Sequence, residues 1–183
     1  AEGVDMAVGG SVKFLLGGPG VGYLYVRPGL TAALRPRLTG WMAHERPFAF
    51  EGDAQRLRPE GSWRFLGGTP HVPALYAARV GYGILRAIGV PAIRERSLAL
   101  TGRLISSARE RGWRVVTPLD DARRGGSVTL DLPGADALVK RLEAREILVD
   151  ARPRAGLRVG PHVYTTEAEI DRFVAATADL VGR

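Results

Sequence analysis

Helical and strand-like segments follow one another in a fixed order after residue 71, and this order restricts the folds open to the chain. Apolar spacing predicts one helix from His71 to a stop at Gly89-Val90-Pro91, and a second from Pro91 to Gly112. The later elements are expected to be strands at 113–118, 127–132, 147–149 and 157–159, a helix at 135–145, and a last helix opened by the capping box Thr166-Glu167-Ala168-Glu169. This order predicts an α+β arrangement with helices on one face of a small sheet.

The N-terminal part has a different character. Residues 21–26 form a short apolar, aromatic run and predict a buried strand, whereas residues 29–70 are irregular and rich in Pro, Gly, Arg and aromatic residues. An irregular segment of this length usually carries function. The first residues lead directly into strand-like sequence, so we expect the chain to be the C-terminal part of a longer protein.

Composition narrows the function classes. The chain has no cysteine, which excludes disulfides, thiolate metal sites and a cysteine nucleophile and fits a cytoplasmic enzyme. His44, His71 and His162 share no ligand spacing, so no metal site is expected. No apolar run is long enough for a membrane span, and no basic-then-apolar leader is present, so neither a membrane partner nor secretion is expected.

The net charge of +7 raises the question of nucleic acid. However, the arginines are spread evenly and many have acidic neighbours, as in Arg94-Glu95-Arg96 and Arg109-Glu110-Arg111. Mixed charge of this kind is typical of solvated helix faces. We therefore expect no nucleic-acid partner, although an anionic small ligand would use part of the excess charge.

Lys13 is unusual because the chain uses arginine at almost every other cationic position. Of 26 Lys and Arg residues, only Lys13 and Lys140 are lysines. A desolvated lysine can attack a carbonyl, which arginine cannot. Small and apolar neighbours surround Lys13 in the sequence, which predicts burial and a neutral amine suited to Schiff-base chemistry. The alternative is a lysine that extends from a strand end into solvent.

Gly17, Gly18, Gly20 and Gly22 follow this lysine and resemble a phosphate-binding loop. Tyr23 stands where a P-loop needs lysine, and it also occupies the third glycine position of the dinucleotide fingerprint. The pattern therefore predicts a tight turn that brings the backbone close to another group, or a plain turn between two strands.

Three further positions are candidates for binding. Trp41 lies in the glycine-flanked stretch Gly40-Trp41-Met42-Ala43-His44. Thr69 directly precedes the first predicted helix, where it can hold a phosphate or act as an ordinary N-cap. Arg158 lies in a predicted strand among glycines and apolar groups, so it needs either a substrate carboxylate or an internal Asp or Glu as its partner.

Taken in order, these pieces resemble the class V aminotransferase family of pyridoxal-phosphate (PLP) enzymes, and within it the kynureninase branch. The stretches that carry the resemblance are GGSVKFLLGGPGVGYLYV, LTGWMAHERPFAFE, RFLGGTP, RERSLALTG, TPLDDARRGGSVTL and GLRVGPHVYTT, which together cover essentially the whole chain.

The resemblance implies the C-terminal part of a PLP-dependent transferase fold, α/β and α+β in class. Residues 1–70 would be the C-terminal portion of the large PLP-binding domain, and residues 71–183 a linking helix and the small C-terminal α+β domain. It implies a homodimer with shared active sites, an amino-acid substrate, and a missing N-terminal half that supplies the ring-stacking aromatic residue and the Asp beside the pyridine nitrogen.

The resemblance also assigns roles to residues. Lys13 matches the lysine that holds PLP covalently and moves protons at the substrate carbon. Trp41 matches the tryptophan whose indole N–H reaches the cofactor phosphate. Thr69 matches a residue that lines the pocket from the neighbouring subunit, and Arg158 the arginine that binds the substrate α-carboxylate. Val12 departs from the pattern, because kynureninases typically have tyrosine and cysteine desulfurases histidine before the lysine.

The expected activity is kynureninase-like, the hydrolytic Cβ–Cγ cleavage of kynurenine to anthranilate and alanine. One alternative is a class V aminotransferase or a cysteine-desulfurase-like lyase that acts on another amino acid. A second alternative is a non-catalytic domain in which Lys13 is structural and the arginines bind polyanions.

Overall fold

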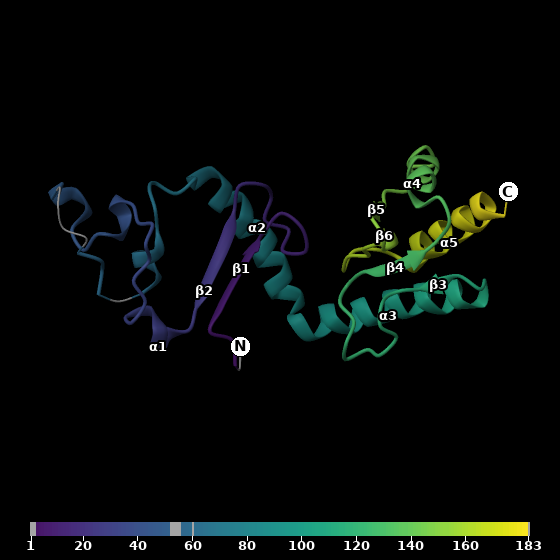
Figure 1. Cartoon of the computed structure of the whole chain (residues 1–183), viewed down its shortest axis with the longest axis horizontal. Coiled ribbons are helices and arrows are strands. Elements are labelled where there is room, and N and C mark those ends of the chain that lie inside the picture. The colour runs from purple at the N-terminus through teal and green to yellow at the C-terminus, as the bar shows by residue number, and fades with distance from the viewer. Residues whose placement is uncertain (1–2, 52–55, 60, 183) are drawn as a thin grey trace. The chain divides into compact units, whose positions relative to one another are not determined.

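The chain divides into two compact units, residues 1–87 and 88–183, in a computed structural model that describes residues 3–51, 56–59 and 61–182 (Figure 1). The boundary follows Ala87, near the end of a long helix, so this helix belongs almost entirely to the first unit. The domain boundary predicted after residue 70 stays a prediction.

A two-stranded antiparallel sheet begins the first unit. Strand β1 (Met6–Gly10) pairs with β2 (Gly22–Val26), with Gly10 opposite Gly22 at the end nearest the connecting loop. The predicted strand at 21–26 is confirmed, but its predicted burial is wrong, because Val26 alone among the β2 residues is buried. The described part of the chain provides no third strand to this sheet, so its apolar side chains stay exposed.

The described residues between β2 and residue 72 agree with the irregular segment predicted at 29–70: apart from an isolated β-bridge between His44 and Leu57, their regular structure consists of short helical turns. These are α1 (Pro28–Thr31) and the 3-10 helices η1 (Trp41–Ala43), η2 (Pro47–Ala49) and η3 (Ser62–Phe65). The buried guanidinium of Arg64 in η3 donates from Nη1 to the carbonyl oxygens of Ala32 and Pro59, at 3.0 and 3.4 Å. Arg64 thereby joins separate parts of an otherwise irregular segment.

The two predicted helices are confirmed as α2 (Val72–Ile88) and α3 (Val90–Glu110). Helix α2 begins one residue later than the predicted His71. Gly89 separates the two helices with a φ of +88°, a conformation that favours glycine. The buried residues of α2 are small, namely Ala74, Ala78 and Gly81, which allows other backbone segments to approach this face closely.

The second unit is built on a four-stranded antiparallel sheet in the order β3-β4-β6-β5. Its strands are β3 (Arg114–Val115), β4 (Val128–Asp131), β5 (Asp150–Arg152) and β6 (Gly156–Val159). Burial alternates along β4 and β6, so one face of the sheet is covered and the other is more open.

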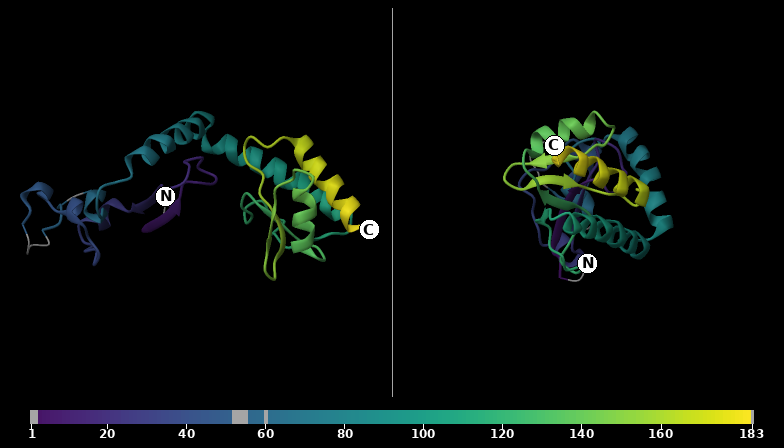
Figure 2. Two further views of the ribbon diagram at one scale, coloured as in Figure 1. Left: turned by 90° about the horizontal axis from the view of Figure 1, so that it is seen from above. Right: turned by 90° about the vertical axis from the view of Figure 1, so that its right-hand side faces the viewer.

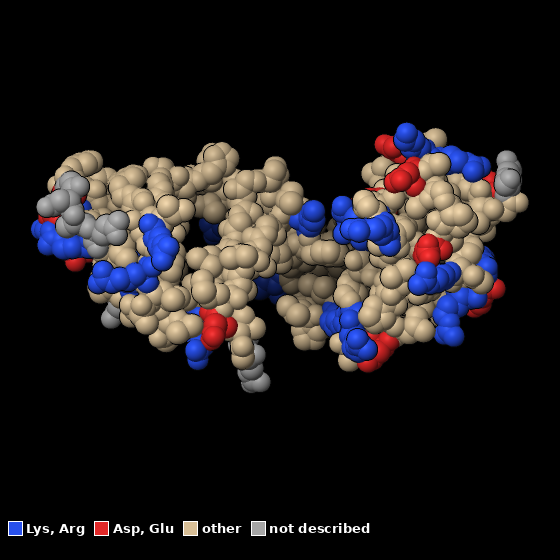
Figure 3. Space-filling view, in the orientation of Figure 1, with Lys and Arg blue, Asp and Glu red and all other residues tan. Residues whose placement is uncertain are grey.

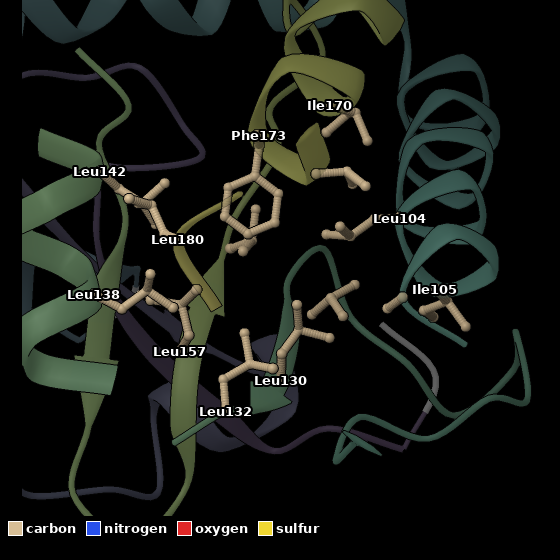
Figure 4. Close-up of a cluster of buried hydrophobic side chains, with 14 of the residues drawn as sticks. Leu104, Ile105, Leu130, Leu132, Leu138, Leu142, Leu157, Ile170, Phe173 and Leu180 are labelled. Atoms are coloured by element: carbon tan, nitrogen blue, oxygen red, sulfur yellow. The ribbon is translucent and has the colours of Figure 1, made fainter. Parts of the chain in front are cut away.

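Three helices pack with the covered face of this sheet. Helix α5 (Glu167–Val181) packs between α3 and α4 (Ala135–Glu143), as Figures 1 and 2 show within this unit. Figure 4 shows the apolar core that they enclose, which includes Leu104, Leu130, Leu142, Leu157 and Phe173. The predicted α+β arrangement, with helices on one face of a small sheet, agrees with this architecture.

Two of the four predicted strands differ from the structure by more than one residue at an end, and the other two by one residue. Only residues 114–115 of the predicted 113–118 run form a strand, and the strand expected at 147–149 lies instead at 150–152. The apolar triplet at 147–149 follows the end of α4, where the Ile147 N–H donates to the Leu142 carbonyl at 3.0 Å. Ile147 and Val149 pack against the core, so these residues close the end of the helix before the strand begins.

The capping box of α5 predicts a pH-dependent contribution to stability. The Glu169 carboxylate accepts from the backbone N–H and the hydroxyl of Thr166, at 2.7 and 2.9 Å. The backbone hydrogen bond, followed by the hydroxyl, lowers the pKa of Glu169 below its ordinary 4.5. Because the folded-state pKa is the lower one, this contribution is complete above the unfolded-state pKa and is lost as pH falls through the folded-state value.

We therefore expect Glu169→Gln to lose less stability than the wild type between about pH 6 and about pH 3, because the amide cannot be protonated in this range. Denaturant unfolding across the range measures the difference, with Glu95→Gln on the exposed surface of α3 as the control. If the wild type and Glu169→Gln changed in parallel with pH, the carboxylate would not have the assigned role.

Candidate functional site

Lys13 lies in the loop of residues 11–21 that joins β1 to β2. The Ser11 N–H donates to the Val21 carbonyl at 2.9 Å and closes the loop at its base. Inside the loop, the Gly17 N–H donates to the Ser11 carbonyl at 2.7 Å, and the Leu16 N–H donates to the Lys13 carbonyl at 2.9 Å. The loop is therefore a hydrogen-bonded structure with a defined backbone around the lysine.

The glycines of this loop serve the close approach that the sequence predicts. Gly18 and Gly20 have φ values of +69° and +88°, which L side chains rarely adopt. A Cβ atom on Gly17 would lie 2.6 Å from the Ser11 Cβ atom, too close for any other residue. The turn is also a connection between two strands, so both predicted descriptions of it apply.

The loop lies along α2 over several turns of the helix. At one end, a Cβ atom on Gly20 would be 3.5 Å from the Cβ atom of Ala74 and 3.6 Å from Nδ1 of His71, which directly precedes the helix. At the other end, a Cβ atom on Gly81 would lie 2.1 Å from the Leu16 carbonyl oxygen, so only glycine fits at position 81. The hydroxyl groups of Ser11 and Tyr82 share a hydrogen bond next to this contact.

The Lys13 side chain is exposed, so its predicted burial by the flanking sequence is wrong for this chain. Its neighbours Val12 and Phe14 are also exposed and do not cover it. Among the described residues, no carboxylate lies within ion-pair distance of the Lys13 amine. The amine is thus accessible and is not committed to a salt bridge with the described part of the chain.

Trp41 is held against the segment that leads to Thr69. A Cβ atom on Gly40 would lie 2.3 Å from the Gly67 carbonyl oxygen, and the Met42 N–H donates to the same oxygen at 3.2 Å. A Cβ atom on Gly68 would be 3.8 Å from Trp41 Nε1. The indole is 43% exposed, and its N–H donates to no residue in the ranges that the structure describes.

Thr69 is exposed and lies three residues before the first residue of α2. The prediction that it directly precedes the helix is therefore wrong, because Pro70 and His71 intervene. Its hydroxyl makes no hydrogen bond with a described residue, which leaves it available to a ligand. The backbone beside Trp41 contacts Gly67 before Thr69, and the lysine loop lies close to His71 after it, so both elements come near the segment that carries Thr69.

Arg158 belongs to the second unit, where it lies on β6 opposite Asp150 of β5. Its Nε and Nη2 atoms donate to the two carboxylate oxygens of Asp150 at 2.9 and 2.6 Å. These hydrogen bonds raise the pKa of Arg158. Of the two partners considered from sequence, the internal carboxylate is present. Nη1 makes no hydrogen bond to a described residue. The edge of the guanidinium formed by Nη1 and Nη2 can therefore donate to a second anion.

Several of the other arginines pair with acidic side chains, and Figure 3 shows blue and red groups next to one another on one face. Arg103 pairs with Asp171, Arg114 with Asp131 and Arg145 with Asp179, each at 2.6 Å. These ion pairs reduce the number of arginines that are open to a polyanion, while the net charge of +7 is unchanged by them. Within the described ranges, no helix is long and apolar enough to cross a membrane, and no three potential ligand side chains gather for a metal ion.

Sequence reasoning missed two contributors, Asp150 and the pair Ser11 and Tyr82. Asp150 could have been found by pairing the charged residues of adjacent strands, but only with the correct bounds of β5. The contact between Ser11 and Tyr82 joins residues 71 positions apart, and no local pattern indicates it.

Comparison with known proteins gives consistent matches. Residues 93–177 match the family described as the kynureninase C-terminal domain. The kynureninase of Pseudomonas fluorescens is 31% identical over 99% of this chain and 44% of its own length. An uncharacterized aminotransferase of Bacillus subtilis is 31% identical over 96% of this chain and 46% of its own length.

The fold is also found in solved structures. The apo structure of a cysteine desulfurase from Thermococcus onnurineus superposes with a TM-score of 0.85 over 97% of this chain and 47% of that one, at 22% identity. The chain spans about half the length of the relatives it matches. It forms the C-terminal part of a PLP-dependent transferase fold, as the sequence predicts. In its motifs, its fold and these matches, the chain is similar to kynureninases and other enzymes of the class V aminotransferase family.

Proposed function

We propose that this chain supplies the cofactor-holding lysine and the substrate-binding arginine of a PLP enzyme that acts on an amino acid. The observation that carries the proposal is Lys13 itself, an accessible amine on a loop whose backbone is fixed by hydrogen bonds and by contact with α2. A nucleophilic amine must be reachable by its carbonyl partner and held in a constant position, and Lys13 meets both conditions.

The residues of the first unit fit the chemistry of PLP. Its aldehyde needs an amine, which Lys13 provides, and its phosphate needs hydrogen-bond donors. No described residue accepts a hydrogen bond from the Trp41 indole N–H or bonds to the Thr69 hydroxyl. Gly68, which directly precedes Thr69, lies close to Trp41 Nε1, so both groups lie near the same segment. When bound, PLP supplies an electron sink that stabilises negative charge on the substrate α-carbon.

In the proposed site, Arg158 binds the substrate α-carboxylate through Nη1 and Nη2, the edge that Asp150 does not occupy. An arginine fork can bind one carboxylate along its side and another at its end, and each charge-assisted hydrogen bond is strong. Asp150 thus keeps the guanidinium in one orientation. Lys13 would hold PLP through its amine, and the same amine would be the base that moves a proton at the substrate α-carbon.

The reaction we favour is the hydrolytic cleavage of kynurenine between Cβ and Cγ, which consumes one water and yields alanine and anthranilate. The match of residues 93–177 to the kynureninase C-terminal domain supports this choice. Transamination is the second candidate, since a relative of equal identity carries the name aminotransferase. A cytoplasmic homodimer with sites shared between subunits completes the proposal.

Replacement of Lys13 tests the cofactor role. Full-length protein incubated with PLP should show the visible absorbance band of the lysine-bound cofactor, and Lys13→Ala should abolish the band, because the amine forms the covalent link. Lys140→Ala is the matched control, since Lys140 is an exposed residue of α4 and the other lysine of this chain. If Lys13→Ala kept the band, the central claim would be wrong.

A substrate panel tests the reaction. Full-length protein with PLP should release fluorescent anthranilate from kynurenine, and should release no sulfide from cysteine and form no pyruvate from alanine with an oxoacid. Transamination of alanine without anthranilate release would instead support the second candidate.

Replacement of Arg158 tests the carboxylate contact. Arg158→Gln should raise KM for the amino-acid substrate by roughly 10- to 100-fold, because hydrogen bonds to charged groups are worth about 1.5–3 kcal/mol. Steady-state kinetics measures the change, and Arg154→Gln, an exposed residue in the turn between β5 and β6, is the control. Equal KM values for the two variants would contradict the assigned contact.

A further inference from the structure

We propose that Tyr82 is a positioning residue for Lys13 and acts through Ser11. This inference rests on the proposed function of Lys13 and adds a residue that lies far from it in the sequence. The hydroxyl groups of Tyr82 and Ser11 share a hydrogen bond, in which either can donate. Ser11 precedes Lys13 by two residues, so a contact that fixes Ser11 also fixes the start of the segment that carries the amine.

Ser11 has the geometry of a fixed anchor. It is fully buried, and each of its polar groups has a partner. Its N–H donates to Val21, its carbonyl accepts from Gly17 at 2.7 Å, and its hydroxyl bonds to Tyr82. The loop therefore closes around Ser11. The Ser11 hydroxyl also joins the loop to α2 through its hydrogen bond with Tyr82.

Tyr82 is suited to hold this anchor because it is carried by a regular helix. The preceding residue is Gly81, where the Leu16 carbonyl approaches α2 so closely that a side chain would not fit. The Tyr82 ring lines an open apolar hollow of about 470 Å³ together with Leu15, Tyr23 and Leu85. The helix thus meets the loop on both sides of Lys13, at Ser11 and at Leu16.

The hydrogen bond between the two hydroxyl groups stabilises the closed form of the loop. Removal of the Tyr82 hydroxyl leaves the Ser11 hydroxyl buried without its partner. A buried hydroxyl without a partner destabilises the folded state by more than the net stabilisation that a typical hydrogen bond provides. The closed loop is then less favourable relative to an open one. We expect Tyr82→Phe to open the loop more often while it leaves the helix and its apolar contacts in place.

Hydrogen exchange of the full-length protein without PLP measures this opening directly. In Tyr82→Phe, the amides of Leu16 and Gly17 should exchange about three- to tenfold faster than in the wild type, as expected for the loss of one buried hydrogen bond. Tyr76→Phe is the matched control, because Tyr76 lies on the same helix and is 68% exposed. Tyr82→Phe exchange equal to that of Tyr76→Phe and wild type would overturn the inference.

A double-mutant cycle separates the pair from general effects on packing. Ser11→Ala should produce a similar acceleration, and the double variant should exchange little faster than either single variant, because both changes remove the same hydrogen bond. Effects that multiply in the double variant would show that the two residues act independently, which also overturns the inference.

The spectrum of the loaded protein connects the anchor to Lys13. Tyr82→Phe should release PLP from Lys13 several-fold faster than wild type and Tyr76→Phe, followed as loss of the visible band after dilution. A wild type that never forms the band would contradict the proposed function alone, whereas unchanged exchange and unchanged release in Tyr82→Phe would contradict the anchor alone.

Discussion

The close packing of residues 11–17 on α2 is the constraint on which the proposed site depends. Two glycines make it possible, since Gly17 accommodates Ser11 and Gly81 accommodates the carbonyl of Leu16. Because the Leu16 carbonyl lies directly against the backbone of Gly81, the loop has little freedom to shift along the helix. A lysine side chain is long and flexible, so the reproducible position that Schiff-base chemistry needs must come from the backbone beneath it.

The same unit leaves many apolar groups exposed. A two-stranded hairpin is only marginally stable in water, and most of β2 is exposed although its sequence is apolar and aromatic. By contrast, the second unit encloses a core of its own with three helices and four strands. Most of β1 and β2 is thus exposed, in a chain that spans about half the length of the relatives it matches.

The sequence predicts those features of the fold that are local. The capping box of α5, the stop at Gly89 and the helical spacing of α3 depend on residues within a few positions of one another, and the structure has all three. The strand expected at 147–149 fails because Ile147 closes the end of α4 through a contact with Leu142, which apolarity alone does not indicate. Likewise, the apolar neighbours of Lys13 in sequence say nothing about which side of the loop they face.

Val12 affects how the site can recognise phosphate. It has no hydrogen-bonding side chain, and the one hydroxyl of the segment 11–13 belongs to Ser11, which is buried and bonded to Tyr82. Side chains beside the lysine therefore offer the phosphate no donor except the amine of Lys13 itself. If PLP binds as proposed, its phosphate must be held by donors from other segments, and Trp41 and Thr69 are the two that we propose. The close approach of Gly40 to Gly67, which brings Trp41 near the segment of Thr69, would then contribute to cofactor binding together with the lysine loop.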